Sequence, residues 1–421
     1  MIAPLTQRIL IYGINYAPEI AGVGKYSGEI GEFLVARGHE VCVVSTPPHY
    51  PGWRALGGYS NKVWSREIVD GATVYRCPLY LHPDMKGIRR ILAPLTFALS
   101  SGPVAITQIL RRRPDVVLVV EPTFFAAPAA LIAAKLVGAK TVLHVQDLEI
   151  DAAFAVGHIG KGGFAAKLAK AFEETTLRFF DQVITISSRM AEKIAEKGVS
   201  PSRIDVIRNW VDVERIRPEI GASPYRAELA LADDIKVALY SGNIGAKQGL
   251  RLIIEAAEQL ADRPDILFVI AGDGPMRGAV AAAADRLPNI RLLPFQPEAR
   301  FSDFLNLADI HLLPQEREAA DLLLPSKLGG MLASGKPILV TADPGTELSD
   351  FLGASCELTP PGDSARVAEA LRRMADAAPD AGARAERLAR AQTLSKRTVI
   401  YAFETALLSP RLGPTQPSPK S

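Results

Sequence analysis

A loop with two close glycines, between a predicted strand and a predicted helix, is the first feature of this chain that could bind a charged ligand. An apolar strand is predicted over residues 8–14, the loop contains Gly22 and Gly24, and a helix is predicted over 23–36. Free backbone N–H groups and the positive end of a helix dipole meet at such a loop, which suits an anion. We expect the phosphate of a small ligand here, although the same glycines also suit a tight turn without a ligand.

This loop differs from the two commonest phosphate motifs. A Walker A loop has Ser or Thr after Gly-Lys, whereas Tyr26 follows Lys25, and Glu19 occupies its first glycine position. The dinucleotide motif has a third glycine where Ser27 stands.

A second glycine loop carries a candidate catalytic cation. Residues 242–249 lie between a strand predicted over 236–241 and a helix predicted over 250–261, and Lys247 lies in this loop. An ammonium group there can reach phosphate oxygens while backbone N–H groups add further donors. If a diphosphate is the leaving group of a reaction, such donors stabilise the charge that develops on it. The alternative is an ordinary lysine at the start of a helix.

Polar side chains also end a buried strand predicted over 140–145. His144 and Gln146 share a face because side chains alternate along a strand, and Asp147 follows them. Asp147 is therefore a candidate for contact with a ligand at this end of the strand. It could equally cap the next helix.

Length and composition predict a two-domain globular protein. A chain of 421 residues exceeds one core, and 48% hydrophobic with 22% charged residues is the balance of a soluble protein. The three cysteines, Cys42, Cys77 and Cys356, have no metal-ligand spacing and favour free thiols in a reducing compartment. The first apolar run, 9–14, is too short for a secretory signal.

Two longer apolar stretches have to be weighed as membrane spans. Residues 91–110 contain Pro94 and Pro103, which predicts two helical segments packed on a sheet. Residues 116–137 contain Glu121, and a buried strand, a loop and a helix are predicted there. Because a span needs about 20 predominantly apolar residues, we expect neither stretch to cross a membrane.

The net charge of +2 is unevenly distributed, with an excess of Lys and Arg in the first half of the chain. The excess includes Lys86, Arg89, Arg90, Arg111, Arg112, Arg113, Lys161, Lys167 and Lys170. Such a face could rest on anionic lipid headgroups, or it could be a set of solvated helix ends. The excess is small and no aromatic-basic module is visible, so nucleic acid is not an expected partner. We expect a cytoplasmic protein with a peripheral contact to the anionic inner face of the plasma membrane.

Strand and helix patterns alternate along the chain, which predicts parallel sheets covered by helices on both faces. The predicted strands are 8–14, 40–45, 73–77, 115–120, 140–145, 182–186 and 204–207, and then 236–241, 266–271, 290–293, 310–313 and 337–341. The restart after 207 predicts two doubly wound, Rossmann-like α/β domains. Helices are predicted over 366–374 and 384–408. Ligands of such sheets bind beyond the carboxyl ends of the strands, which for two facing domains is the cleft between them.

Several ordered motifs resemble those of one family. They are Tyr16-Ala-Pro-Glu19 with Gly22-Val-Gly24, Val206-Ile-Arg-Asn209-Trp-Val-Asp212, Ser241-Gly-Asn-Ile-Gly-Ala-Lys247-Gln-Gly249, Ala271-Gly-Asp-Gly-Pro275, Ala308-Asp-Ile-His-Leu-Leu-Pro314, Leu324-Pro-Ser-Lys327 and Ala333-Ser-Gly-Lys-Pro337. Together they resemble the retaining GT-B glycosyltransferases of family 4, close to the WcaI-like exopolysaccharide (colanic-acid type) enzymes. The resemblance covers roughly residues 8–408.

The resemblance implies a GT-B fold with an N-terminal acceptor domain (1–210), a C-terminal donor domain (211–395) and a helix returning to the N-terminal domain (396–409). The four prolines of residues 410–421 predict a disordered tail. The resemblance also implies transfer of a sugar from a UDP- or GDP-sugar to a lipid-linked or oligosaccharide acceptor, with no cofactor and no metal. Catalytic roles fall to Lys247 and Asp147. The implied donor-binding residues are Gly22, Gly24, Gly242, Asn243, Gly245, Gly272, Gly274, Ser326, Lys327 and Glu347, and the implied acceptor or sugar contacts are Gln146, His144 and Glu19.

The chain departs from the family pattern at the phosphates and at the ribose. Asn243 stands where many members have an arginine, so Lys247 must carry more charge or Lys327 must assist. Leu322 and Gly330 stand at the positions of the usual glutamate pair. Glu347 resembles the acidic residue after the last core strand, but it could also cap the next helix.

Other interpretations remain open at this point. Gly272 and Gly274 after a strand could belong to a nicotinamide-dependent dehydrogenase, although Arg277 replaces the third glycine. The missing arginine and glutamates would fit a non-catalytic sugar-nucleotide-binding partner. A GT-B epimerase would need acid–base groups at the sugar ring, for which Asp147, Glu149 and His144 are the candidates.

Overall fold

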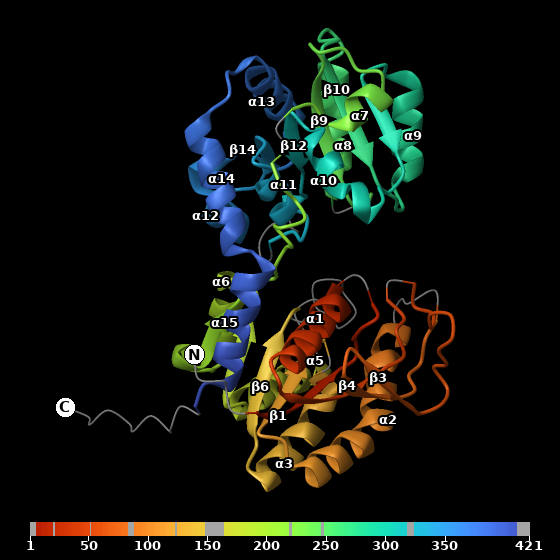
Figure 1. Cartoon of the computed structure of the whole chain (residues 1–421), viewed down its shortest axis with the longest axis vertical. Coiled ribbons are helices and arrows are strands. Elements are labelled where there is room, and N and C mark those ends of the chain that lie inside the picture. The colour runs from red at the N-terminus through yellow and green to blue at the C-terminus, as the bar shows by residue number, and fades with distance from the viewer. Residues whose placement is uncertain are drawn as a thin grey trace, which may run out of the picture. The chain divides into compact units, whose positions relative to one another are not determined.

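The computed structural model describes residues 6–19, 22–50, 52–82, 88–122, 124–147, 164–218, 221–245, 248–317 and 324–410. The chain forms two compact units, one of Met1–Ile207 with Ile400–Ser421 and one of Arg208–Val399. Each unit is a sheet covered by helices (Figure 1). The predicted tail lies outside the described residues, apart from Pro410.

The first unit holds an eight-stranded sheet with the order β3-β4-β2-β1-β5-β6-β7-β8. Its strands are β1 (Arg8–Gly13), β2 (Glu40–Ser45), β3 (Ser65–Val69), β4 (Ala72–Arg76), β5 (Val116–Val120), β6 (Lys140–Val145), β7 (Gln182–Thr185) and β8 (Ile204–Val206). All neighbouring strands are parallel except the edge strand β3, which is antiparallel to β4. The prediction of a doubly wound parallel sheet is therefore confirmed, with one antiparallel strand added at its edge.

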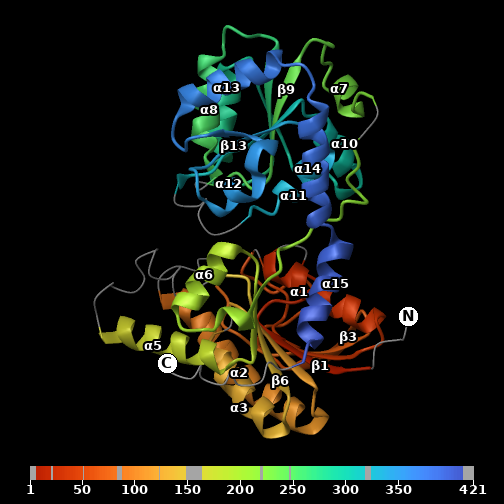
Figure 2. The same cartoon turned by 90° about the vertical axis from the view of Figure 1, so that its left-hand side faces the viewer.

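Helices cover both faces of this sheet, which is why β5 and β6 are buried along their whole length. The helices of the first unit are α1 (Gly22–Ala36), α2 (Ile88–Arg112), α3 (Ala127–Val137), α5 (Phe164–Phe179), α6 (Ser188–Glu196) and most of α15 (Lys396–Leu408). Right-handed crossovers place α2, α3 and α5 on one face and α1 on the other (Figure 2).

Helix α2 corrects the prediction of two separate segments over 91–110. It is one helix of 25 residues that contains Pro94 and Pro103. Its inner face packs on the sheet, where the rings of Phe97 and Tyr12 have centroids 5.6 Å apart. The Tyr12 hydroxyl and the Ser101 hydroxyl are 2.6 Å apart. Packing along the whole inner face offsets the hydrogen bonds that the prolines cannot donate.

The second unit holds a six-stranded parallel sheet with the order β11-β10-β9-β12-β13-β14. Its strands are β9 (Lys236–Ser241), β10 (Ile266–Ala271), β11 (Ile290–Leu293), β12 (Ile310–Leu313), β13 (Ile338–Thr341) and β14 (Glu357–Thr359). Its helices are α7 (Pro224–Glu228), α8 (Leu250–Gln259), α9 (Arg277–Arg286), α10 (Phe301–Asn306), α11 (Leu328–Ser334), α12 (Glu347–Leu352), α13 (Ser364–Asp376) and α14 (Ala381–Thr393). The helix predicted over 384–408 is in fact two helices, α14 and α15.

Helix α15 binds to the first unit through the charged side chain of Glu404 and through the carbonyl groups at its C-terminal end. The Glu404 carboxylate accepts from Arg37 Nε at 3.0 Å and lies 3.1 Å from His39 Nε2. The buried Lys140 ammonium donates to the carbonyl oxygens of Leu407 at 3.0 Å and Ser409 at 2.8 Å. A cation at the carbonyl end of a helix also compensates the helix dipole.

Candidate functional site

The predicted site residues fall into two groups, one in each unit. Glu19 lies between β1 and α1, Gly22 and Gly24 lie in the first turn of α1, and His144, Gln146 and Asp147 lie at the end of β6. The remaining donor residues belong to the second unit. Both groups lie at the carboxyl ends of their strands, where ligands of such sheets bind.

Two glycine loops of the second unit are joined by backbone hydrogen bonds. The loop after β9 donates from Gly242 N to Ala271 O at 3.0 Å and from Ile244 N to Asp273 O at 2.8 Å. The loop after β10 donates back from Met276 N to Ile244 O at 3.0 Å. The two loops therefore form one rigid backbone surface at the ends of neighbouring strands.

Glycine is required where these loops cross. Gly272 has φ 148°, and a Cβ atom there would lie 1.8 Å from the carbonyl oxygen of Gly242. Gly274 has φ 152°, and its Cβ atom would lie 2.6 Å from the carbonyl oxygen of Ile244. No side chain fits at either distance, so the crossing explains the Gly-Asp-Gly sequence without reference to a ligand. It also leaves backbone uncovered by side chains, as a close phosphate needs.

Lys327 brings a cation to the first of these loops. Its ammonium nitrogen lies 4.0 Å from the ring centroid of Tyr240 on β9, and a Cβ atom on Gly242 would be 3.8 Å from the same nitrogen. Burial lowers the pKa of Lys327 to about 7. The neighbouring Ser326 is exposed. The structure thus places Lys327 beside Gly242, as the predicted assistance to the phosphate loop requires.

The structure describes some, but not all, of the other residues predicted for the phosphate loop. Lys247, the predicted catalytic cation, lies outside the described residues. Asn243 is exposed, and its carbonyl oxygen accepts from the Tyr240 hydroxyl at 2.6 Å. Gly245 is buried, and a Cβ atom there would lie 3.1 Å from Asn243 Nδ2.

Glu347 does not cap α12, so that alternative is wrong. The cap is Thr346, whose hydroxyl accepts from Ser349 N at 3.3 Å while the Ser349 hydroxyl accepts from Thr346 N at 3.0 Å. The buried Glu347 carboxylate instead accepts from Arg208 Nη2 at 2.6 Å. The sequence motif that contains Arg208 was recognised, but its arginine was not assigned this partner.

The absence of a glutamate at position 330 has a steric reason. Gly330 is buried in α11, and a Cβ atom there would lie 3.0 Å from Leu305 Cδ1 and 3.4 Å from Ile216 Cδ1. A glutamate side chain would have to displace this apolar packing. Leu322, the other departure from the family pair, lies outside the described residues.

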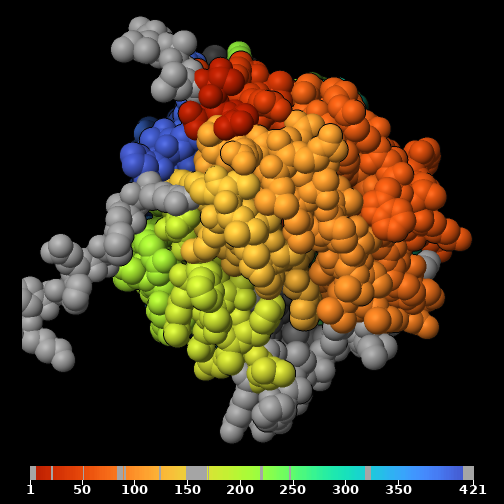
Figure 3. All heavy atoms as spheres, turned by 90° about the horizontal axis from the view of Figure 1, so that it is seen from below, coloured from red at the N-terminus to blue at the C-terminus, as the bar shows by residue number. Residues whose placement is uncertain are grey.

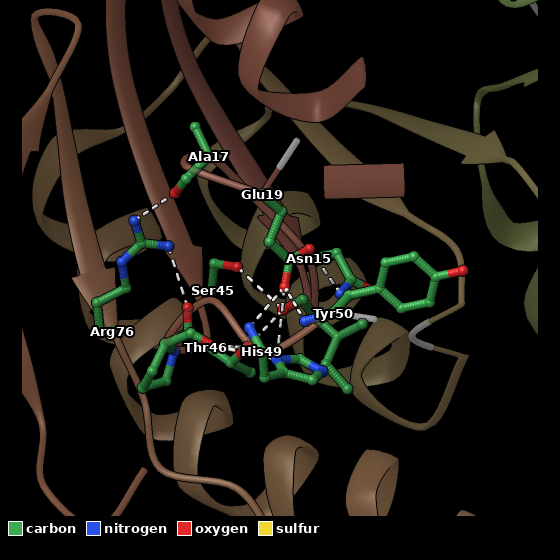
Figure 4. A network of polar contacts seen from close by, with 10 residues as sticks. Asn15, Ala17, Glu19, Ser45, Thr46, His49, Tyr50 and Arg76 are labelled. Atoms are coloured by element: carbon green, nitrogen blue, oxygen red, sulfur yellow. Dashed lines mark hydrogen bonds and ion pairs between the residues drawn. The ribbon is translucent and has the colours of Figure 1, made fainter. Parts of the chain in front are cut away.

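In the first unit, Glu19 organises the loop that follows β2 (Figure 4). Its Oε1 atom accepts from the backbone N–H groups of His49 at 2.8 Å and Tyr50 at 3.0 Å, and its Oε2 atom accepts from Asn15 Nδ2 at 2.9 Å. The side chain is fully buried. Both oxygens are therefore engaged by the protein itself, an arrangement that differs from the predicted sugar contact.

Arg76 fixes the same region from the other side (Figure 4). It is fully buried and donates from Nη1 to Thr46 O at 3.0 Å and from Nη2 to Ala17 O at 2.5 Å. Its Nε atom lies 2.6 Å from Glu67 Oε1. The sequence does not single out Arg76 or His49, because the contacts that tie them to Glu19, Thr46 and Ala17 join segments 30 or more residues apart.

Gly22 and Gly24 meet the backbone and steric demands of this loop. Gly22 has φ 62°, in the left-handed region. A Cβ atom on Gly24 would lie 2.1 Å from Glu19 Oε2. The turn interpretation thus holds for both glycines. It does not exclude a phosphate contact, because both interpretations use the same bare backbone.

His144 lies in the interior. Gln146 Nε2 and His144 Nε2 are 3.2 Å apart, which bears out the prediction that they share a face. The His144 ring packs on Phe403 of α15 with centroids 4.9 Å apart, and burial lowers its pKa to about 3. A neutral, buried ring under a helix is a core residue more than a sugar contact. Asp147 is exposed at the end of the strand.

Within the described ranges, no three His, Cys, Asp or Glu side chains are placed to hold a metal ion. Cys42, Cys77 and Cys356 are free thiols. Burial raises the pKa of Cys42 to about 11 and that of Cys77 to about 12. Neither thiol is thus a ready nucleophile at neutral pH.

The chain thus has two Rossmann-like units, and the second of them carries the two joined glycine loops. Residues 21–210 match the family described as glycosyl transferase 4-like domain, and residues 235–377 match glycosyl transferases group 1. The chain belongs to this family, the family 4 type of GT-B glycosyltransferases, as the sequence motifs predicted.

Among its relatives, the chain is 43% identical over 359 residues to a putative colanic acid biosynthesis glycosyl transferase, WcaI of Escherichia coli, covering 84% of this chain and 86% of that protein. It is similar in fold to a sucrose-phosphate synthase of Thermosynechococcus elongatus, with a TM-score of 0.71, 15% identity and coverage of 95% and 98%. It is also similar to HepE of Anabaena in complex with UDP, with a TM-score of 0.66, 15% identity and coverage of 95% and 99%.

The family assignment leaves the dehydrogenase interpretation of Gly272 and Gly274 without support. The crossing of the two loops already accounts for these glycines. The chain is a glycosyltransferase with two Rossmann-like units.

Proposed function

We propose that this chain is a retaining glycosyltransferase that moves a sugar from a UDP- or GDP-sugar to a lipid-linked or oligosaccharide acceptor in exopolysaccharide synthesis. The observation that carries the proposal is the joined pair of glycine loops in the second unit, with Lys327 beside Gly242. This surface offers backbone N–H groups and a cation to a diphosphate.

The reaction would break the bond between the anomeric carbon of the sugar and the diphosphate oxygen. The acceptor oxygen would bond to the same face of that carbon, and its proton would pass to a phosphate oxygen of the leaving group. Retention then needs no side-chain base, no cofactor and no metal. Lys247 and Lys327 would stabilise the charge on the leaving diphosphate, and the exposed Asp147 would contact the acceptor hydroxyl or the cationic sugar.

Two relatives support the choice of substrates. HepE structures with the same fold hold UDP and UDP-glucose, which supports a nucleoside diphosphate donor. WcaI is assigned to colanic acid biosynthesis, which supports an exopolysaccharide acceptor. A lipid-linked acceptor would bring the enzyme to the cytoplasmic face of the membrane.

A screen of thermal stability tests the donor. The chain is measured with UDP, GDP, their common sugar conjugates and NAD(H), and so is the Lys247→Ala variant. We expect one nucleoside diphosphate to raise the melting temperature of the wild type but not of the variant. Full glycosyl transfer by Lys247→Ala would reject the assigned site.

A second candidate is a non-catalytic sugar-nucleotide-binding partner of another transferase. Asn243 in place of the family arginine and the crowded Gly330 in place of a glutamate favour it. Nucleotide binding without turnover, across a broad panel of donors and acceptors, would support this candidate. Transfer of a labelled sugar to any acceptor would remove it.

A further inference from the structure

The outer face of α2 carries an apolar stripe that nothing in the described structure covers. Leu95, Leu99, Pro103, Ile106 and Leu110 are exposed and follow one another at intervals of three or four residues. Leu99 is 78% exposed. Because such intervals bring side chains to one side of a helix, these residues form a continuous line. The opposite side of the same helix packs on the sheet.

Helix α3 packs beside α2 and continues the apolar surface. Ile132 and Leu136, one turn apart, are 65% and 73% exposed. Phe179 of α5 adds an exposed ring, with Lys135 Nζ 5.7 Å from its centroid. Figure 3 looks onto this side of the first unit, where α2 and α3 form the orange surface. We call the exposed apolar residues named here on α2 and α3, together with Phe179, the apolar face.

All charged side chains of α2 and α3 are positive. These helices contain no Asp or Glu, whereas Arg111, Arg112 and Lys135 are on them and Arg113 follows α2. In the described part of the chain, neither Arg111 nor Lys135 forms an ion pair, while Arg112 pairs with Glu40. The carboxylate of Glu174 on α5 lies within 4 Å of Lys170 and of Arg178, at 3.8 and 3.7 Å.

We propose that the apolar face is a docking surface for an anionic lipid bilayer, with its leucine and isoleucine side chains between the acyl chains and Arg111, Arg113 and Lys135 at the phosphates. Apolar side chains beside unpaired cations fit this partner, because a bilayer offers both a hydrocarbon layer and negative headgroups. The inference deepens the proposed function, since the same membrane would carry the lipid-linked acceptor.

The arrangement argues for docking rather than crossing. Within the described residues, one stretch is long and apolar enough to span a membrane, Leu92–Arg112 of α2, and 44% of it is buried. Its buried side belongs to the core through Phe97, Ala105 and Ile109. Inserting the helix across a bilayer would expose the sheet beneath it. A helix that rests on the surface of the bilayer keeps all of these core contacts.

Vesicle sedimentation of the full chain tests the proposal. Vesicles of phosphatidylcholine alone are compared with vesicles of phosphatidylcholine and phosphatidylglycerol. The test variant is Leu99→Glu with Leu136→Glu, and its control is Phe295→Glu, which changes an exposed apolar side chain of the second unit. A second test variant is Arg111→Gln with Lys135→Gln, with Arg251→Gln on α8 as its control.

We expect the wild type to bind only the anionic vesicles. The double glutamate variant should bind roughly tenfold or more weakly, and loss of each cation should weaken binding roughly fivefold. Both controls should bind as the wild type does. Failure of the wild type to bind anionic vesicles, or wild-type binding by the double glutamate variant, would overturn the proposal. So would a dimer that the double glutamate variant converts to a monomer, because a second copy would then cover the face.

Stabilisation by soluble UDP or GDP is measured on the same preparations. That measurement reports on the proposed donor site and on correct folding, without lipid. A chain that binds nucleotide but no vesicle rejects the docking surface alone. A chain that binds vesicles but no nucleotide rejects the donor site alone.

Discussion

The ammonium nitrogen of Lys327 lies over the face of the Tyr240 ring, 4.0 Å from its centroid. The ring is itself fixed, because its hydroxyl donates to the carbonyl oxygen of Asn243 at 2.6 Å. A cation over an aromatic face is attracted by the ring quadrupole. Burial acts in the opposite direction, because it removes water from the ammonium group and lowers the pKa of Lys327 to about 7. Near pH 7 Lys327 is therefore only partly protonated, and a bound diphosphate would favour its charged form.

Affinity for a nucleoside diphosphate sugar should therefore fall as the pH rises above 7. Below that pH Lys327 is already charged, so binding should change little. Above it, binding must be accompanied by proton uptake, and affinity should fall by up to roughly tenfold per pH unit. Calorimetric titration between pH 6 and 9 measures this, and buffers of different ionisation enthalpy report the proton directly. An affinity that does not change with pH would contradict a contact between Lys327 and the phosphates.

The stability of the ligand-free protein should follow the opposite trend. The pKa of Lys327 lies below its ordinary value of 10.5, so between pH 7 and 10.5 the unfolded chain binds more protons than the folded one. The contribution of this group to stability therefore rises with pH across that window. Unfolding of the wild type and of Lys327→Met at several pH values measures the contribution as a difference. No pH dependence in that difference would contradict the lowered pKa.

Removing the Lys327 charge should weaken donor binding without unfolding the protein. Lys327→Met keeps the length of the side chain and should reduce nucleotide affinity roughly 10- to 100-fold, the effect of one charge-assisted hydrogen bond. Lys236→Met is the matched control, because Lys236 begins the strand that carries Tyr240 near its other end. Equal losses in the two variants would indicate a general charge effect in place of a contact.

Adding one carbon where the two glycine loops cross should disrupt the donor site. A Cβ atom on Gly272 would lie 1.8 Å from Gly242 O, so Gly272→Ala must separate the loops and should destabilise the second unit by about 3 kcal/mol. Gly278→Ala on α9 is the control, since no atom lies within 4 Å of its added carbon, and it should stabilise the helix by up to about 1 kcal/mol. Chemical denaturation of both variants gives these values. Similar stability of the two would show that the loops separate easily.

Most strands were predictable because each is a short apolar run that a covered parallel sheet requires. The edge strand β3 escaped prediction because three of its five residues, Ser65–Val69, are exposed and the other two are half-buried. Its sequence therefore carries no core pattern. The short strand β14, Glu357–Thr359, was also not predicted. The two prolines of α2 gave the wrong helix boundaries, since the sequence does not reveal the packing that keeps such a helix continuous.

The candidate site was predictable where it depends on backbone. The glycines of the two joined loops lie directly after β9 and β10, in the loops that the sequence predicted. Side-chain partners were a different matter, because they join distant segments. The pairing of Arg208 with Glu347 and the contact of Lys327 with Tyr240 need the fold to bring their ends together. Glu19 shows the same limit, because its type and position suggested a ligand contact while its partners on the next loop were not visible.

We expect Glu19 to act as a structural latch, a side chain that holds the loop after β2 in place. Glu19→Ala removes the acceptor of three hydrogen bonds, from Asn15 and the backbone of His49 and Tyr50, of which the His49 bond is buried and the other two are partly buried. We expect a loss of about 2–4 kcal/mol in unfolding free energy, because each unsatisfied donor costs about 1–3 kcal/mol and the loop can relax in part. Glu32→Ala, an exposed change on α1, should cost little.

Comparing Glu19→Ala with Glu19→Gln separates a structural role of Glu19 from a contact with the sugar. If Glu19 only holds the loop, nucleotide binding to the second unit should survive in Glu19→Ala at a temperature where the protein is folded. Glu19→Gln should keep the contacts to the two backbone N–H groups and recover most of the stability, and with it most of the transfer activity. If Glu19→Gln is instead as stable as the wild type but inactive, then the carboxylate charge acts on the sugar and the latch is not its main role.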